Sequence, residues 1–157
     1  DNLDLLKFNL EIFHASFEKM NLLISGNYYV YKMESMQEAW NLPDWDAKLS
    51  LEYKASEQLT FSSDLFFVGS RKAVIYSYPG EDPRPLSNAD IMNLENLQTE
   101  VHNLESIFDL NFNADYKVTD KLSVFVQLNN FAFNKYQHWF GYPVQSFNIL
   151  GGLGYAF

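Results

Sequence analysis

The chain has 157 residues, the length of one domain or of part of one, and a formal net charge of −9 that argues against nucleic-acid binding. It has no cysteine, which excludes disulfides, thiolate metal sites and cysteine nucleophiles. No run approaches the ~18 apolar residues of a transmembrane helix, but 14 Phe and 10 Tyr favour β-structure or a membrane interface. Because the chain begins at Asp1 without a signal peptide, we expect a mature product, a trimmed chain or a fragment of a longer protein.

Apolar and polar residues alternate with a period of two along most of the chain, and this period predicts β-strands. In chain order, the alternating stretches are 7–14, 21–30, 45–54, 59–67, 108–117, 122–129 and 146–157. In the first stretch the phase becomes ambiguous around Phe13 and His14, where a β-bulge would explain it. The fold class predicted is all-β, an antiparallel transmembrane β-barrel of which these are about seven C-terminal strands.

Short and long connections alternate along the chain. The short ones lie at 18–19, 56–58 and 119–121, and the long ones at approximately 34–43, 77–103 and 134–145. This order is typical of outer-membrane barrels, which have tight periplasmic turns and longer extracellular loops. Tyr and Trp residues near both ends of the strands would form the two aromatic girdles of such a barrel. A soluble β-sandwich or lipocalin-like barrel also alternates and stays open as an alternative.

The last stretch ends on an aromatic residue at Phe157. Leu153, Tyr155 and Phe157 alternate on one face, which resembles the C-terminal assembly signal read by the barrel assembly machinery. With the C-terminus in the periplasm, the first strand would begin on the extracellular side. Seven strands would not close a barrel, so we expect further strands of the same protein or a partner that covers residues 8–12.

Two stretches resemble a known family. Leu128-Asn-Asn-Phe-Ala-Phe-Asn-Lys-Tyr-Gln137 resembles the L-x-N-L-F-N-x-x-Y stretch of TonB-dependent receptors, with Ala132 and Phe133 where the family has Phe and Asn. Trp139-Phe-Gly-Tyr-Pro143, Phe147-Asn-Ile-Leu-Gly-Gly152 and the terminal Phe are similar to the endings of Bacteroidetes-type members. The plug domain and the TonB-box segment of the family are not in this chain.

The resemblance implies a barrel in the outer membrane of a Gram-negative bacterium that imports a bulky nutrient. The alternative is a structural or accessory barrel subunit of a larger outer-membrane assembly. The partners expected are the lipid bilayer and the barrel assembly machinery. TonB and a surface lipoprotein or another outer-membrane subunit are further candidate partners.

The candidate site residues fall into two further groups besides the assembly signal. Polar residues expected to face the lumen are Asp46, Lys48, Glu52, Asp64, Asp109, Asn111, Asn113, Asp115 and Gln127. Residues expected to form an extracellular contact surface are Trp40, Tyr136, Trp139, Phe140 and Tyr142, four of them an aromatic cluster within seven residues.

Neither catalysis nor a cofactor is expected, because the chain has no G-x-S-x-G or H-E-x-x-H motif. No recurrent ligand spacing predicts a metal site around His102, Glu100 and Glu105. The long loop is acidic, which leaves calcium binding as a minor alternative to a solvated surface. Residues 91–104 also fit a helical stripe with a capping box at Ser87, but we favour a loop whose end extends the following strand.

Overall fold

The protein is described by a computed structural model, which covers residues 3–34, 38–78, 80, 87 and 98–157. Throughout these residues the regular elements are antiparallel β-strands. In the same part of the chain, no helix is long and apolar enough to cross a membrane. The predicted all-β antiparallel fold class is therefore confirmed.

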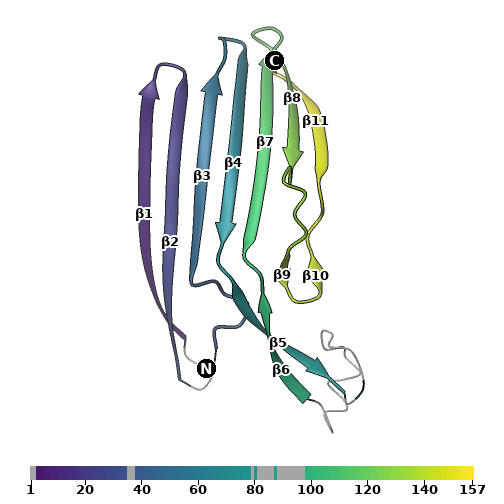
Figure 1. Cartoon of the computed structure of the whole chain (residues 1–157). Helices are drawn as coiled ribbons and strands as arrows, with labels where there is room; N and C mark the ends of the chain where they lie inside the picture. The colour runs from purple at the N-terminus through teal and green to yellow at the C-terminus, as the bar shows by residue number, and fades with distance from the viewer. Residues whose placement is uncertain (1–2, 35–37, 79, 81–86, 88–97) are drawn as a thin grey trace.

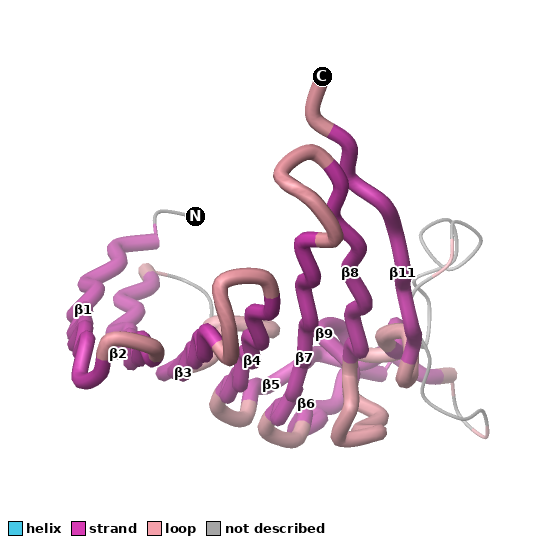
Figure 2. Tube along the Cα trace, turned by 90° about the horizontal axis from the view of Figure 1, so that it is seen from above, coloured by secondary structure: helices cyan, strands magenta, loops and turns pink. Residues whose placement is uncertain are grey.

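Seven strands form one curved sheet, in which each strand pairs with the next sheet strand along the chain (Figures 1 and 2). The strands are β1 (Leu3–Phe17), β2 (Met20–Met33), β3 (Trp45–Lys54), β4 (Leu59–Val68), β7 (Ile107–Lys117), β8 (Leu122–Asn129) and β11 (Asn148–Tyr155). Their lengths include the 9–11 residues typical of a tilted transmembrane β-strand. The β1–β2 register shifts between His14 and Phe17, immediately after the residues where the sequence pattern loses its phase.

The connections divide between the two ends of the sheet. The short turns from β1 to β2, β3 to β4 and β7 to β8 lie at the end where the C-terminus lies, at the top of Figure 1. The long connections lie at the opposite end, which we call the long-loop end. Any side chain near this end is therefore close to the long connections rather than to the turns.

Two of the long connections contain hairpins that sequence analysis did not predict. β5 (Arg71–Ser77) pairs with β6 (Gln98–Leu104), so residues 98–103, expected within a loop, form a strand of a separate two-stranded sheet. β9 (Gln137–Trp139) pairs with β10 (Tyr142–Pro143) within the connection expected at 134–145. Residues 98–104 of the alternative helical stripe form β6, so there the favoured extended loop end fits and the helix is wrong. Residues 91–97 and most of the acidic loop lie outside the described residues.

The main sheet has no second layer against it within the described part of the chain. Its apolar side chains are consequently exposed, as Leu10 at 66% and Leu153 at 75% illustrate. The buried side chains that the structure does describe are Arg71, Ala73, Ile75, Leu104, Ile107 and Asn130. These residues lie at the long-loop end, so the packed core of the described chain is there and not on the sheet.

Candidate functional site

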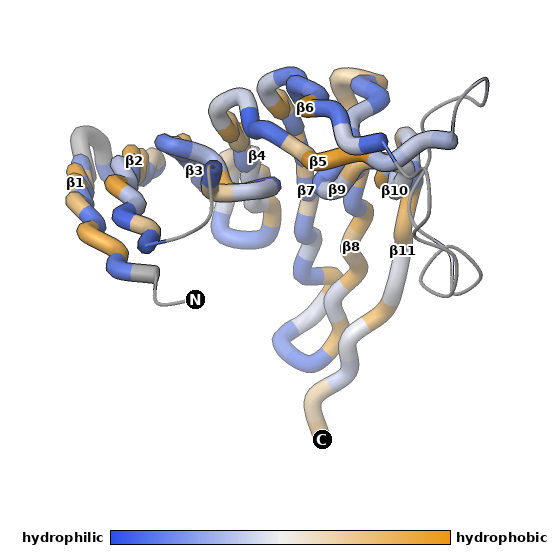
Figure 3. The backbone as a smooth tube through the Cα atoms, turned by 90° about the horizontal axis from the view of Figure 1, so that it is seen from below, coloured by the Kyte–Doolittle hydropathy of each residue, from blue (hydrophilic) through white to orange (hydrophobic). Residues whose placement is uncertain are grey.

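The strand register divides the sheet into two chemically different faces. Side chains of paired residues point to the same face, and successive residues point to opposite faces. The face that we call the apolar face carries, one from each strand in sheet order, Leu10, Ile24, Leu49, Leu65, Leu110, Val126 and Leu153. Hydrophobic and hydrophilic colours accordingly alternate along the strands in Figure 3. A shift of one residue in the register of any strand pair would move the side chains of one strand to the opposite face.

The apolar face is almost free of charge across all seven strands. For β1 the residues considered are 4–14, and for the other strands all residues. The acidic or basic side chains on this face are His14 and the pair Asp4 and Lys32, which are register partners near the long-loop end. Ser63 also points to this face, and its hydroxyl donates a hydrogen bond of 3.1 Å to the backbone carbonyl of Asn111. That bond satisfies the hydroxyl without water, as an apolar environment requires.

The opposite face, which we call the polar face, carries all nine residues predicted to line a lumen. They are Asp46, Lys48, Glu52, Asp64, Asp109, Asn111, Asn113, Asp115 and Gln127. The structure thus gathers side chains from four strands, β3, β4, β7 and β8, onto one surface. That this surface lines a lumen stays a prediction at this point.

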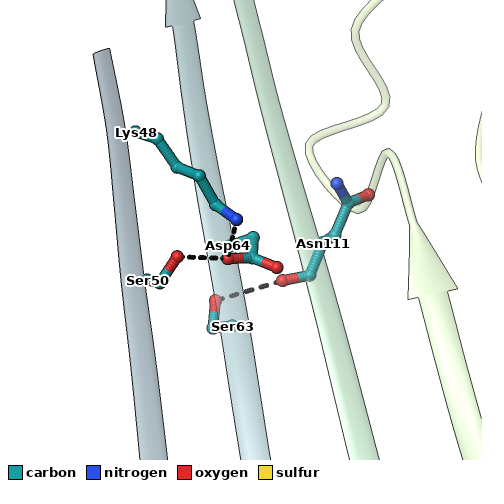
Figure 4. A network of polar contacts seen from close by, with 5 residues as sticks. All are labelled: Lys48, Ser50, Ser63, Asp64 and Asn111. Atoms are coloured by element: carbon teal, nitrogen blue, oxygen red, sulfur yellow. Dashed lines mark hydrogen bonds and ion pairs between the residues drawn. The ribbon is translucent and has the colours of Figure 1, made fainter. Parts of the chain in front are cut away.

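Asp64 and Lys48 form the centre of the polar face (Figure 4). The Lys48 ammonium lies 3.0 Å from Asp64 Oδ1, and the Ser50 hydroxyl donates to the same oxygen at 2.5 Å. Lys48 also lies over the Phe66 ring, 5.0 Å from its centroid. Opposite charges on neighbouring strands stabilise the sheet locally, and both partners here remain about two-fifths exposed, so the pair contributes little beyond alignment.

A second network surrounds Asp46, nearer the long-loop end. Asn27 Nδ2 donates to Asp46 at 2.7 Å and the Tyr29 hydroxyl donates at 2.6 Å, while Asn9 Nδ2 donates to Asn27 at 2.9 Å. The chain of bonds therefore crosses β1, β2 and β3. Closer to the turns, Asn21 donates to Glu52 at 3.1 Å, so Glu52, like Asp46 and Asp64, is held by a donor from a neighbouring strand.

Two hollows lie on the polar face. The larger, of about 460 Å³, is lined by sheet residues that include Asn27, Asp46 and Lys48, and at its long-loop side by Arg71 and His138. A smaller one, of about 180 Å³, is lined by a second set of polar residues. These include Asp64, Asn111, Asn113 and Gln127. The polar face thus carries charges of both signs, and apolar side chains such as Phe66 and Val68 also line its larger hollow.

An asparagine turn joins β8 to the β9–β10 connection. Asn130 is buried and has a positive φ of 50°. Its side chain forms hydrogen bonds with the backbone of Asn134, and its backbone N–H donates a hydrogen bond of 2.9 Å to Asn111 Oδ1. The Asn134 side chain in turn donates to the Phe108 carbonyl at 2.8 Å. Asparagine is among the few residues that adopt a left-handed conformation readily, which explains its place here.

Two neighbours of this turn show how the connection is fastened. The Tyr136 hydroxyl donates to Asp109 Oδ2 at 2.6 Å, and burial together with this bond raises the pKa of Tyr136. Phe133 has a positive φ of 55°, which is strained for an aromatic residue, and it packs on Phe147 with ring centroids 4.8 Å apart. Phe133 stands at the position where the family motif has Asn, a residue that would carry this φ with less strain.

No family model and no curated protein sequence matches the chain. Solved structures do match it. The ferripyoverdine receptor of the outer membrane of Pseudomonas aeruginosa, bound to ferripyoverdine, matches 98% of this chain with 19% of its own, at a TM-score of 0.75 and 17% identity. The chain has the fold of part of a TonB-dependent-receptor-like barrel.

Two further receptors match to a similar extent. The siderophore receptor PiuA from Acinetobacter baumannii matches 98% of this chain with 22% of its own, at a TM-score of 0.66 and 14% identity. The ferric-catecholate import receptor Fiu from E. coli K12 matches 98% with 21% of its own, at 0.65 and 12% identity. The chain therefore spans about a fifth of the length of these receptors, and the likeness is one of fold.

Within this receptor-type fold, the five predicted contact residues do not form one aromatic cluster. Tyr136 is half-buried against Asp109, and Phe140 packs edge-on against His102, with ring centroids 5.0 Å apart. Trp139 and Tyr142 are cross-strand partners in the β9–β10 hairpin and are 55% and 64% exposed. The fifth residue, Trp40, is half-buried in the β2–β3 connection. The side chains separate because Trp139 and Tyr142 pair across the hairpin, whereas Phe140 lies in the turn between β9 and β10 and Tyr136 precedes β9.

The three predicted assembly-signal residues lie at the short-turn end of the receptor-type sheet. Leu153 and Tyr155 share the apolar face of β11, and Tyr155 packs edge-on against Phe157 with ring centroids 5.3 Å apart. All three side chains are exposed. Their role in assembly stays a prediction. Among the described residues, no group of three or more His, Cys, Asp and Glu side chains could hold a metal ion.

Sequence analysis missed three residues that the barrel fold makes important. Arg71 is buried and contacts two other segments, although nothing in its local sequence distinguishes it from a surface arginine. Asn130 was part of the family motif, but its role as the buried centre of a turn was not anticipated. Phe125, a hydrophobic residue on the polar face, lies on Gly152, where a methyl group would come within 2.5 Å of its ring. Small-residue runs such as Gly151-Gly152 were the available signal for such a close approach.

Proposed function

We propose that this chain is part of an outer-membrane barrel of the TonB-dependent-receptor type that imports a bulky nutrient. The observation that carries the proposal is the separation of chemistry between the two faces of the seven-stranded sheet. A face that is apolar on every strand suits the hydrocarbon of a bilayer, and a face with paired charges and carboxamides suits a watery interior. A soluble sandwich would instead cover its apolar face with a second layer.

The sidedness proposed follows from the distribution of aromatic residues and connections. Tyr28 and Trp45 are register partners on the apolar face near the long-loop end, and Tyr53 and Tyr116 lie on it near the turns. Aromatic side chains at both margins of an apolar band are typical of the two membrane interfaces. We infer that the long-loop end is extracellular and the short-turn end periplasmic. The outer membrane of a Gram-negative bacterium is the location that this arrangement supports.

Import is the function favoured, because the matched receptors include siderophore and ferric-catecholate import receptors. The nutrient, the use of TonB and any surface lipoprotein belong to the proposal. A second candidate, an accessory barrel subunit of a larger assembly, is favoured by the exposed Trp139–Tyr142 pair, since exposed aromatic pairs suit contact with another protein.

Depletion of nutrients by living cells tests import against the accessory role. Cells with and without the full protein would be incubated with a defined mixture of ferric siderophores, oligosaccharides and peptides, and depletion followed by mass spectrometry. Import predicts that at least one component is depleted only by cells with the protein, and that a protonophore abolishes the depletion. Equal depletion by both strains, together with loss of another outer-membrane protein from the deletion strain, would contradict import and support the accessory role.

A further inference from the structure

Most of the buried side chains of the described chain lie on one side of the β5–β6 hairpin. Arg71, Ala73 and Ile75 alternate on β5, and Leu104 on β6 is the register partner of Arg71. His102, the partner of Ala73, packs against Phe140 from the β9–β10 connection. One face of the β5–β6 hairpin is therefore covered by a segment more than thirty residues away in the sequence.

Arg71 makes the polar contacts across this covered face. Its guanidinium donates to the backbone carbonyls of Gln137 at 2.9 Å, His138 at 3.1 Å and Glu105 at 3.1 Å. Gln137 and His138 belong to β9, whereas Glu105 lies between β6 and β7. A single side chain thus joins three separate segments through main-chain acceptors, which do not depend on the neighbouring side chains.

The environment of Arg71 is unusual for a cation. It is only 4% exposed, and no salt bridge to it is found among the described residues. Burial lowers the pKa of Arg71, and its Nε has no hydrogen-bond partner in the described chain. A buried charge held by carbonyls alone is costly, so the geometry that retains it has to be well defined.

Lys72, the residue after Arg71, joins β5 to the β2–β3 connection. Lys72 pairs with Glu38, and its backbone carbonyl accepts a hydrogen bond of 2.7 Å from the Asn41 amide. Glu38 and Asn41 lie in the β2–β3 connection. The start of β5 therefore touches the connections that precede β3 and follow β8, in addition to its own.

We propose that Arg71 is a latch that fastens the β9–β10 hairpin onto the β5–β6 hairpin and so keeps the long connections together as one packed unit. The unit borders the larger hollow, because Arg71 and His138 both line it. Opening the latch would release the β9–β10 hairpin, with its exposed Trp139–Tyr142 pair, without unpairing the main sheet. The proposed role of Arg71 does not depend on which nutrient the barrel imports.

Hydrogen exchange on the full protein in lipid nanodiscs tests the latch, with Arg71→Met compared with Lys72→Met. Because the charge-assisted bonds to the main chain of β9 and to Glu105 are lost only in Arg71→Met, amides of β5, β6 and β9 should exchange at least about tenfold faster in that variant. Amides of β7 and β8 should keep their protection. Lys72→Met is the matched control, since its side chain points to the β2–β3 connection, and it should leave β9 exchange within about twofold.

A cross-linking measurement with His102→Cys and Phe140→Cys reports the proximity of the two hairpins, because these substitutions leave the Arg71 bonds to the β9 main chain in place. Cysteines at His102 and Phe140, joined by a short bifunctional thiol reagent, should link efficiently in the parent and at least about fivefold less in Arg71→Met. Unchanged β9 exchange or unchanged cross-linking would overturn the latch. Arg71→Gln, which retains a donor, guards against a folding failure: if both variants lose the protection of β7 and β8, Arg71 supports the sheet rather than the connections and the proposal fails.

Discussion

Two variants, each with one arginine on a different face of β8, distinguish a sheet that faces lipid from a sheet of a soluble protein. Val126 is on the apolar face and Gln127, the next residue, is on the polar face. Val126 is the fifth of the eight residues of β8, and its register partners on the two neighbouring strands are Ala114 and Gly151. Both partners are small, so the aliphatic part of an arginine side chain at position 126 fits without steric clash. The cost of Val126→Arg is therefore the free energy of transferring a charge into the hydrocarbon.

The expected magnitude follows from that position. An arginine at the midplane of a transmembrane barrel costs about 2–4 kcal/mol, and the cost falls to about 0–1 kcal/mol near the interfaces. Val126 lies near the middle of its strand, so the upper range applies. Gln127→Arg places the same charge on a hydrated polar surface and should cost within about 0.5 kcal/mol. A difference of about 2 kcal/mol corresponds to about a 30-fold change in the folding equilibrium.

Denaturant unfolding of the full protein in lipid vesicles, followed by tryptophan fluorescence, measures both variants. The free energy of unfolding should fall by at least about 2 kcal/mol for Val126→Arg relative to Gln127→Arg. An equal loss in the two variants, or a larger loss for Gln127→Arg, would refute the assignment of the apolar face to lipid.

Three further predictions concern local contacts. Gly152→Ala should lower the free energy of unfolding by about 1–3 kcal/mol because its methyl group meets the Phe125 ring, whereas Gly151→Ala, which meets only ordinary contacts, should cost less than about 1 kcal/mol. Asn130→Ala should cost about 1–3 kcal/mol and raise protease sensitivity of the β8–β9 connection, since buried partners lose their bonds. The folded state raises the pKa of Tyr136 above 10, the usual tyrosine value, so it favours the neutral phenol. The difference in unfolding free energy between wild type and Tyr136→Phe should therefore be constant below pH 10 and should shrink as the pH rises above 10. A difference that grows at high pH would contradict this sign.

The sheet and its two faces were predictable from local pattern. In β7, strict alternation from Phe108 to Lys117 assigns each side chain to a face without any knowledge of the neighbouring strands. The same rule placed all nine polar candidates on one surface. Ion pairs between neighbouring strands were expected on this face. The particular pair of Lys48 and Asp64 was not predictable, because the exact register depends on the turns.

The two additional hairpins were not predictable from the same rule. Residues 71–76 are two basic residues followed by four apolar or aromatic ones, so they do not alternate, and the long connection was expected to begin only at residue 77. The chain leaves the main sheet at Gly69, where the Trp45 indole lies so close that a methyl group would come within 2.8 Å. A glycine inside a strand pattern is a signal for such a bend, but it does not say where the chain goes next.

The latch and the asparagine turn depend on contacts between distant segments. Arg71 is buried only because the β9–β10 hairpin covers it, and a single sequence contains no sign of that packing. Asn130 is buried because it bonds Asn134 and lies against Asn111 on a neighbouring strand. The family motif marked the segment but not these roles. For the contact residues, proximity in sequence does not make one cluster, because Phe140 lies in the turn and packs on His102, whereas Trp139 pairs with Tyr142.

The most direct test of the membrane-sheet account is a spin-label scan of consecutive positions from Phe108 to Asp115 in the full protein, reconstituted in lipid bilayers. Collision with oxygen, which concentrates in hydrocarbon, would be compared with collision with a water-soluble nickel complex. A lipid-facing apolar face should give a period of two, with oxygen maxima at Phe108, Leu110, Phe112 and Ala114 and nickel maxima at the four positions between and after them. The reverse phase, or no alternation, would contradict the claim that the apolar face meets lipid and the polar face meets water.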